Sequence, residues 1–122
     1  MRAYLDLTNR GQAQRIRLLA RQAVEAFGLV DARLDLLDHA ENTTFRVTAP
    51  QGRYVLRVHR PGYRSPAEIQ SELWWLDALT REAGLRVPRP QRTPDGRWLV
   101  QCQVPGVPEP RDCVLFEWLD GR

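Results

Sequence analysis

Two helical repeats of apolar residues are the clearest patterns along the chain. In the first, Gln12–Phe27, apolar side chains recur every three or four positions, and Gly28 follows as a natural helix end. The second begins at Ser65–Glu68, which places an N-cap serine, a proline and a glutamate in the order of a capping box. Its apolar stripe consists of Ile69, Leu73, Leu76 and Leu79. The pattern predicts two amphipathic helices, the second reaching about Glu82 and ending near Gly84.

Period-two patterns predict strands elsewhere. The segments 43–48 and 53–59 are rich in β-branched and aromatic residues, and an Ala-Pro-Gln-Gly turn separates them, as in an antiparallel hairpin. Further strands are predicted at 34–37, 98–104 and 112–118. The order helix, three strands, long helix, two strands predicts an α+β fold, with one five-stranded antiparallel sheet and a helix packed on it.

Composition narrows the class of protein without naming it. The 122 residues fit one domain, and the formal net charge of +3 comes from scattered arginines, because the chain has no lysine. A basic balance this modest gives no argument for nucleic-acid binding. No apolar run is long enough to span a bilayer, and the first ten residues lack the core of a signal peptide. We therefore expect a cytoplasmic protein with no membrane contact.

Two cysteines lack the spacing and the histidine partners of a zinc site. Cys102 and Cys113 are expected to be reduced, partly buried thiols that could face each other on adjacent strands, with no assigned function. His39 and His59 have no carboxylate or serine partner at a recognisable spacing, so we expect surface or strand residues and not catalytic bases.

Two charges of opposite sign occupy awkward positions on successive elements. Strand alternation places Arg57 on the same face as Val55 and His59, where a fully solvated charge is not expected. Glu72 falls at the edge of the second helix's apolar stripe. Pairing these two residues satisfies both charges, although such a pair can be purely structural. Glu68 is the competing partner, but the capping box already accounts for it.

Five segments in the correct order resemble a known family. They read ENTTFRV (41–47), YVLRVHRPGYRS (54–65), IQSELWWLDAL (69–79), GLRVPRP (84–90) and VLFEWLDG (114–121). Together they resemble the N-terminal lobe of the aminoglycoside phosphotransferase-like family, and most of all its homoserine-kinase-like branch. The resemblance implies an N-terminal helical segment at 1–33, followed at 34–122 by a nucleotide-binding, protein-kinase-like lobe that ends at the hinge.

The resemblance assigns phosphate contacts to three parts of the chain. The turn at Asn42, Thr43 and Thr44 would cover the nucleotide phosphates with side-chain and backbone donors. Arg57 would take the place of the phosphate-anchoring lysine, and Glu72 would orient it. Arginine departs from the protein-kinase pattern, but this role needs a fixed positive charge and no proton transfer.

Adenine contacts are assigned to two strands and the hinge. Val47 and Val55 would face the adenine ring. The backbone carbonyl of Glu117 and the amide of Leu119 would bind the adenine edge.

The implied activity is transfer of the γ-phosphate of ATP to a hydroxyl group of a small molecule or of a protein Ser or Thr. The base and the Mg²⁺ ligands of the family come from a His-Gly-Asp segment and later residues, which the 122 residues do not contain. A C-terminal catalytic lobe is thus an expected partner, and the chain alone is expected to be inactive.

Two other functional classes stay open. A non-catalytic interaction module would use the sheet or the pair Trp74 and Trp75. A basic nucleic-acid-binding domain is the third hypothesis. Arg60, Tyr63 and Arg64 form a loop that is either solvated or close to phosphates.

Overall fold

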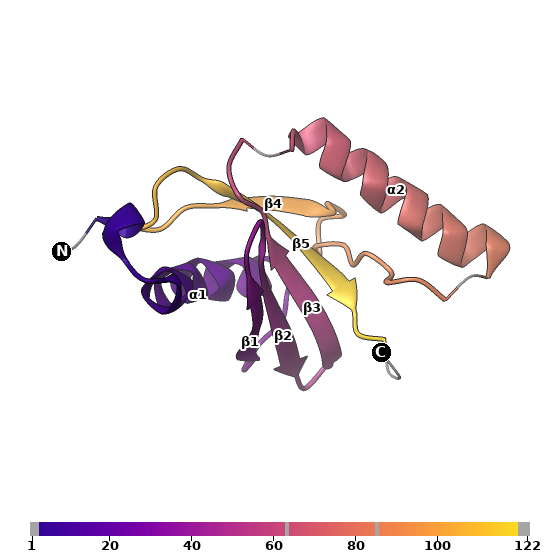
Figure 1. Ribbon diagram of the computed structural model, residues 1–122. Helices are drawn as coiled ribbons and strands as arrows, with labels where there is room; N and C mark the ends of the chain where they lie inside the picture. Colours follow the sequence, from indigo (N-terminus) through magenta and orange to yellow (C-terminus); the bar gives the residue numbers. More distant parts are fainter. Residues whose placement is uncertain (1–2, 63, 85, 120–122) are drawn as a thin grey trace.

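The sheet and two long helices of the computed structural model confirm the α+β prediction (Figure 1). The structure describes residues 3–62, 64–84 and 86–119, so Tyr63 lies outside the described residues. The elements are η1 (Tyr4–Asp6), α1 (Asn9–Ala26), β1 (Arg33–His39), β2 (Thr43–Ala49), β3 (Gly52–Val58), α2 (Pro66–Ala83), β4 (Leu99–Cys102) and β5 (Arg111–Glu117). All five strands pair antiparallel in the order β1-β2-β3-β5-β4.

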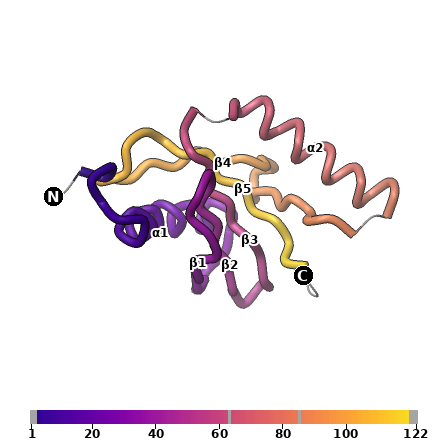
Figure 2. Tube along the Cα trace, viewed as in Figure 1, coloured from indigo at the N-terminus to yellow at the C-terminus, as the bar shows by residue number. Residues whose placement is uncertain are grey.

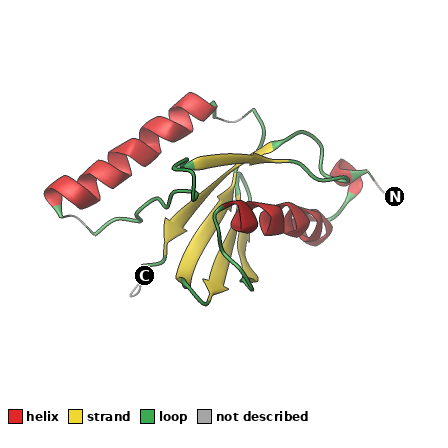
Figure 3. Cartoon of the chain, turned by 180° about the vertical axis from the view of Figure 1, so that it is seen from behind, coloured by secondary structure: helices red, strands yellow, loops and turns green. Residues whose placement is uncertain are grey.

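Helix α1 covers one face of the sheet, which we call the α1 face (Figure 3). The helix begins three residues earlier than predicted, because the Thr8 side chain caps it by accepting a hydrogen bond from the Gly11 amide. Ile16, Leu19 and other apolar residues of α1 share a buried core with the sheet. Cys102 and Cys113 lie in this core as free thiols, and they are fully buried where partial burial was expected.

Helix α2 lies on the opposite side, the α2 face, where Figures 1 and 2 show it as a separate layer. The predicted capping box starts it, and Gly84 ends it in the left-handed conformation at φ 65°. A small apolar cluster joins α2 to the sheet; its buried members are Ile69, Leu73, Trp98, Val114 and Phe116. Because this cluster is small, α2 is held to the sheet largely by these few side chains and by polar contacts.

The linker from Arg86 to Gln91 runs beside the end of β5. The Gln91 amide donates to the Leu115 carbonyl at 2.8 Å, and the Glu117 amide donates to the Arg89 carbonyl at 2.9 Å. On α2, the buried Asp77 binds the side chains of Arg81 at 2.8 Å and Arg89 at 3.5 Å. The linker is therefore fixed to both the sheet and the helix.

None of the helices in the described part of the chain combines the length and apolar character needed to cross a membrane.

Candidate functional site

A cleft of about 450 Å³ opens between α2, the α2 face of the sheet and the linker. Apolar side chains form most of its wall, with one cation, Arg57, and two carboxylates, Glu72 and Glu117, among them. Six residues that the sequence singled out line it together: Thr44, Val55, Arg57, Glu72, Glu117 and Leu119. Leu76, Pro88, Phe116 and Trp118 complete the wall.

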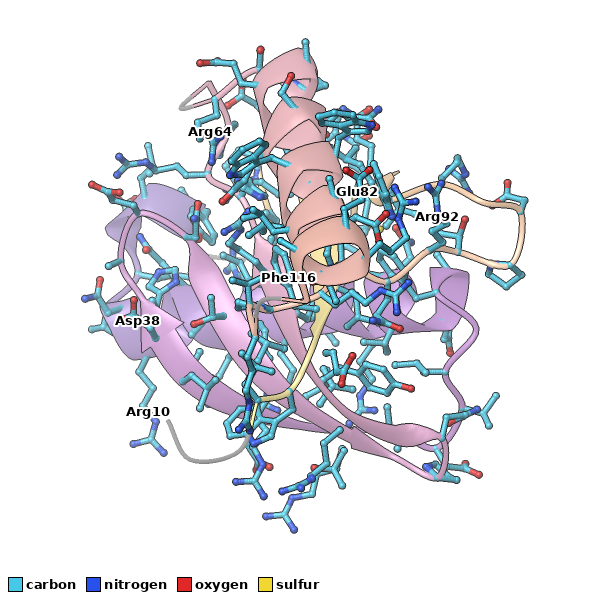
Figure 4. All side chains as sticks on the ribbon, turned by 90° about the vertical axis from the view of Figure 1, so that its right-hand side faces the viewer. Arg10, Asp38, Arg64, Glu82, Arg92 and Phe116 are labelled. Carbon is cyan, nitrogen blue, oxygen red and sulfur yellow. The ribbon has the colours of Figure 1, made fainter. Side chains whose placement is uncertain are left out.

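Arg57 and Glu72 form the predicted ion pair, with Nη2 and Oε1 2.8 Å apart. β3 directs Arg57 to the α2 face by strand alternation, and α2 presents Glu72 from its second turn. The guanidinium also lies over the Phe116 ring, 4.9 Å from its centroid. In Figure 4 Phe116 is beneath α2, in the space between the helix and the sheet. The cation is thus held in one place at the cleft.

Glu72 accepts hydrogen bonds from two arginines on the same oxygen. Arg64 Nη1 lies 2.9 Å from Oε1, beside the 2.8 Å contact from Arg57. Arg64 comes from the loop before α2 and is seen beside the helix in Figure 4. Burial raises the pKa of Glu72, but the two guanidinium groups outweigh this effect, and the net pKa is lowered. Glu72 is therefore a carboxylate at neutral pH.

His59 is the third residue, after Glu72 and Phe116, that contacts the Arg57 side chain. Its side chain is 3% exposed, and its Nε2 accepts a hydrogen bond from Arg57 Nε at 3.1 Å. Burial and the neighbouring charges of Arg57 and Arg64 lower the pKa of His59 to about 4. Since Nε2 is the acceptor, the ring is neutral with its proton on Nδ1. The surface or strand role expected for His59 missed this contact, although alternation from Val55 through Arg57 leads directly to it.

Glu68 serves as a helix cap, as the sequence predicts. The Ser65 amide donates to Glu68 Oε1 at 2.8 Å, and the Glu68 amide donates to Ser65 Oγ at 3.1 Å. This reciprocal pair occupies the carboxylate, which leaves the Arg57 contact to Glu72.

Val47 and Thr43 do not join the cleft. The expectation that Val47 faces the same ligand surface as Val55 is wrong, because β2 pairs Val47 with Tyr54 and Arg46 with Val55. Val47 is fully buried in the α1-face core. Thr43 is also buried, and its Oγ1 lies 2.6 Å from His39 Nδ1. Residues of opposite parity on β2 reach the α2 face.

Arg46, which the sequence did not single out, and Asn42, which the resemblance assigned to the phosphates, both lie outside the cleft lining. Arg46 stacks over the Trp118 ring at 5.4 Å, at the edge of the cleft to which Trp118 belongs. Asn42, at the β1–β2 turn, has a buried Oδ1 without a hydrogen-bond partner among the described residues. Asn42 itself does not line the cleft.

At the end of β5, successive backbone amides point alternately toward β3 and toward the linker. The Trp118 amide donates to the Arg53 carbonyl at 3.2 Å, whereas the Glu117 amide donates to Arg89 in the linker. Because the amide and carbonyl of one residue point to the same side of an antiparallel strand, Glu117, the last residue of β5, presents its backbone on the linker side. Leu119 follows two residues later. Both residues line the cleft there.

Metal ligands are not gathered in the described residues. Nowhere in 3–62, 64–84 and 86–119 do three or more His, Cys, Asp or Glu side chains form a group that could hold a metal ion. Of the two carboxylates that line the cleft, Glu72 is already held by Arg57 and Arg64, so the cleft lining does not by itself form a site for the Mg²⁺ that the resemblance implies.

Comparisons with known proteins agree with this architecture. The chain is 38% identical over 104 residues to an uncharacterised protein of Deinococcus radiodurans, a match that covers 85% of this chain and 30% of that protein. The structure of a microcompartment-associated aminopropanol kinase matches with a TM-score of 0.74 and 38% identity, over 86% of this chain and 32% of that one. An amicoumacin kinase, solved in complex with AMP-PNP, Ca²⁺ and Ami, shares the fold at a TM-score of 0.73 and 20% identity, over 87% and 31% of the two chains.

The chain spans about a third of the length of these relatives. Residues 33–122, from the start of β1 onward, match the phosphotransferase enzyme family. These residues contain every strand of the sheet, helix α2 and the whole lining of the cleft. The chain therefore belongs to the phosphotransferase enzyme family, and its fold is that of the N-terminal lobe of kinase-like phosphotransferases.

Proposed function

We propose that the cleft binds ATP, with the triphosphate at Arg57 and the adenine ring toward the linker. The arrangement that carries the proposal is the Arg57–Glu72 pair at a cleft whose other walls are mostly apolar. Val55, Leu76 and Phe116 offer apolar surface to a flat ring. An adenine edge would exchange hydrogen bonds with the Glu117 carbonyl and the Leu119 amide, and both residues line the cleft.

The chemical task of these residues is positioning and charge neutralisation. A guanidinium holds phosphate oxygens through charge-assisted, forked hydrogen bonds. Glu72, Phe116 and His59 fix Arg57 from three sides, so little side-chain entropy is lost when phosphate binds. No proton transfer is required of any of them, which suits a neutral, buried His59.

We infer that in an enzyme of the relatives' length this chain supplies the nucleotide-binding part. The longer protein would transfer the γ-phosphate of ATP to a hydroxyl of a small molecule. Phosphoryl transfer needs an orienting base and Mg²⁺ ligands, and the described residues group none. The chain on its own is accordingly expected to bind nucleotide weakly and to transfer no phosphate.

Titration of the 122-residue chain with ATP tests the proposal. Arg57→Gln should weaken ATP binding about 10- to 100-fold, the value of one or two charge-assisted hydrogen bonds. Arg33→Gln is the matched control, because Arg33 is an exposed arginine at the start of β1 and pairs only with Asp35 in the part of the chain described. Adenosine, which lacks phosphates, should bind both variants equally. Equal ATP affinity in Arg57→Gln and Arg33→Gln would overturn the proposal.

One observation favours a second function. Trp74 and Trp75 are neighbours on α2 and are each 58% exposed, so they form an apolar surface that a partner could cover. An interaction module would use this surface, and binding of its partner would be unchanged by Arg57→Gln and lost in a Trp74→Ala, Trp75→Ala double variant.

A further inference from the structure

A second cavity, of about 560 Å³, lies on the other side of the sheet from the cleft. Its walls come from η1, the first turns of α1, the β1–β2 turn, the residues after β3 and the loop before β5. Figures 1 and 3 show η1 next to the long loop between β4 and β5, at the end of the molecule away from α2. None of the residues lining this cavity also lines the cleft.

Arg111, the first residue of β5, is the buried cation of this cavity. Its side chain faces the α1 face, and the residue is only 5% exposed. Within the described chain it makes no ion pair: Nε donates to the Pro108 carbonyl at 3.4 Å, and the guanidinium lies 5.5 Å from the centre of the Tyr4 ring. A buried charge without a counter-charge is costly, because it has given up its hydration.

The arginine of the cleft has a counter-charge, whereas Arg111 has none among the described residues. Arg57, the cation of the cleft, is better exposed than Arg111 and still has the carboxylate of Glu72 at 2.8 Å. Arg111 is deeper, and its contacts are a long one to the Pro108 carbonyl and those to the ring and the hydroxyl of Tyr4, none of which is a counter-charge. An anion from solution would supply the missing partner.

The polar wall next to Arg111 contains a neutral, ordered set of hydrogen bonds around His39. His39 Nε2 lies 3.0 Å from Gln12 Oε1, and His39 Nδ1 lies 2.6 Å from Thr43 Oγ1. The Gln12 amide nitrogen donates to the Tyr4 carbonyl, which leaves Oε1 as an acceptor and places the His39 proton on Nε2. Burial and the charge of Arg111 lower the pKa of His39, so His39 adds no cation to the cavity. Arg60 also lines the cavity and is exposed at its rim.

Helix α1 and the cavity rim define the electrostatic setting. Asn9 and Gln12 bring the first turn of α1 to the cavity, and that turn contains no acidic residue. The positive end of the helix dipole therefore adds to the charge of Arg111. Glu41 and Glu109 are the acidic lining residues, and both are exposed at the rim, where water screens them.

We propose that this cavity is a second ligand site, which takes an organic oxyanion by placing its phosphate or carboxylate on Arg111. Tyr4, Pro61 and Pro108 provide apolar surface for the organic part. The ligand would contact the β1–β2 turn from the side opposite to the cleft, since Thr43 lines the cavity and Thr44 lines the cleft. The site is separate from ATP binding and holds whether or not the cleft binds a nucleotide.

Amide-resolved NMR titration of the 122-residue chain with phenyl phosphate and with benzoate tests this site. Saturable shifts are expected at Ala40, Glu41 and Glu109, with at least one of the two compounds. Preference for one compound identifies the anion class. Inorganic phosphate should bind more weakly, because it lacks the apolar part.

Variants separate this site from the cleft. Arg111→Met should raise the Kd about tenfold or more, the value of a lost charge-assisted contact, while Arg57→Gln should leave it unchanged. Arg111→Lys keeps the charge and should fall in between, which covers the case that Arg111→Met does not fold. Shifts confined to cleft residues such as Thr44 and Leu119, or no saturable shift with either compound in the wild-type chain, would overturn the proposal.

Discussion

His59 is expected to make the stability of the protein depend on pH in a specific window. The ring is buried and accepts a hydrogen bond from Arg57, and its pKa in the folded chain is lowered to about 4. In the unfolded chain an ordinary histidine titrates near 6.5. As the pH falls below about 6.5, the unfolded chain binds a proton that the folded chain does not, so the free energy of unfolding decreases until about pH 4.

The size of the effect follows from the two pKa values. Between pH 7.5 and pH 5 the contribution of His59 should fall by about 2 kcal/mol, since one pKa unit corresponds to roughly 1.4 kcal/mol. Protonation also places a hydrogen on Nε2, which then opposes the N–H of Arg57. The charges facing the ring are those of Arg57 and Arg64, which disfavour the proton, and Glu72, which favours it less strongly.

Urea unfolding of the wild-type chain and of His59→Gln at several pH values measures this contribution. Glutamine can still accept from Arg57 but does not titrate, and all other titrations are common to both chains. The stability difference between wild type and variant should shift by about 2 kcal/mol against the wild type between pH 7.5 and pH 5. A difference that stays constant over this range would refute the reasoning, as would an NMR titration that places the pKa of His59 near 6.5.

Two further predictions concern the helix cap and the thiols. Ser65→Ala removes the acceptor of the Glu68 amide and should lower the free energy of unfolding in urea by about 1 kcal/mol. The Arg57–Glu72 contact and the ATP affinity should not change. A loss of ATP binding free energy larger than the loss of stability would contradict the assignment of Glu68 as a cap. Cys113 is fully buried, and its pKa is raised by its hydrogen bond with Cys102 and by burial. In folded Cys102→Ala, the Cys113 thiol should therefore react with a disulfide reagent about a hundredfold more slowly than in the same variant unfolded in urea. Equal rates would show that the α1-face core is open.

The sequence predicts the fold well because its local signals agree with each other. The capping box, the glycine after each helix and the hairpin turn each specify one element end, and the structure follows them within a few residues. β4 is shorter than the predicted strand 98–104, since Trp98, Gln103 and Val104 lie outside it and only Leu99–Cys102 pairs with β5. Short connections then favour the antiparallel pairing of β1 with β2 and of β2 with β3, whereas the pairing of β3 with β5 joins distant segments.

The candidate site is predicted in part, and parity explains the difference. Alternation along β3 gives the correct face for Val55 and Arg57, and helix geometry gives the correct edge for Glu72. The same rule applied to β2 would have exchanged Val47 for its neighbour Arg46. The assignment of Val47 came from the family resemblance and not from strand alternation.

Contacts between distant parts of the chain could not be obtained from local pattern. The second arginine on Glu72, the ring beneath Arg57 and the buried Arg111 depend on where a loop, β5 and η1 meet in space. A single sequence gives no measure of such distances. These contacts complete the cleft and the second cavity.

The most direct test of the central claim is a crystal structure of this chain with a non-hydrolysable ATP analogue. The account predicts phosphate oxygens within hydrogen-bond distance of the Arg57 guanidinium while Glu72 still holds it, with the adenine ring in the apolar cleft on the linker side. An analogue bound elsewhere on the chain, or bound in the cleft with its phosphates away from Arg57, would contradict it.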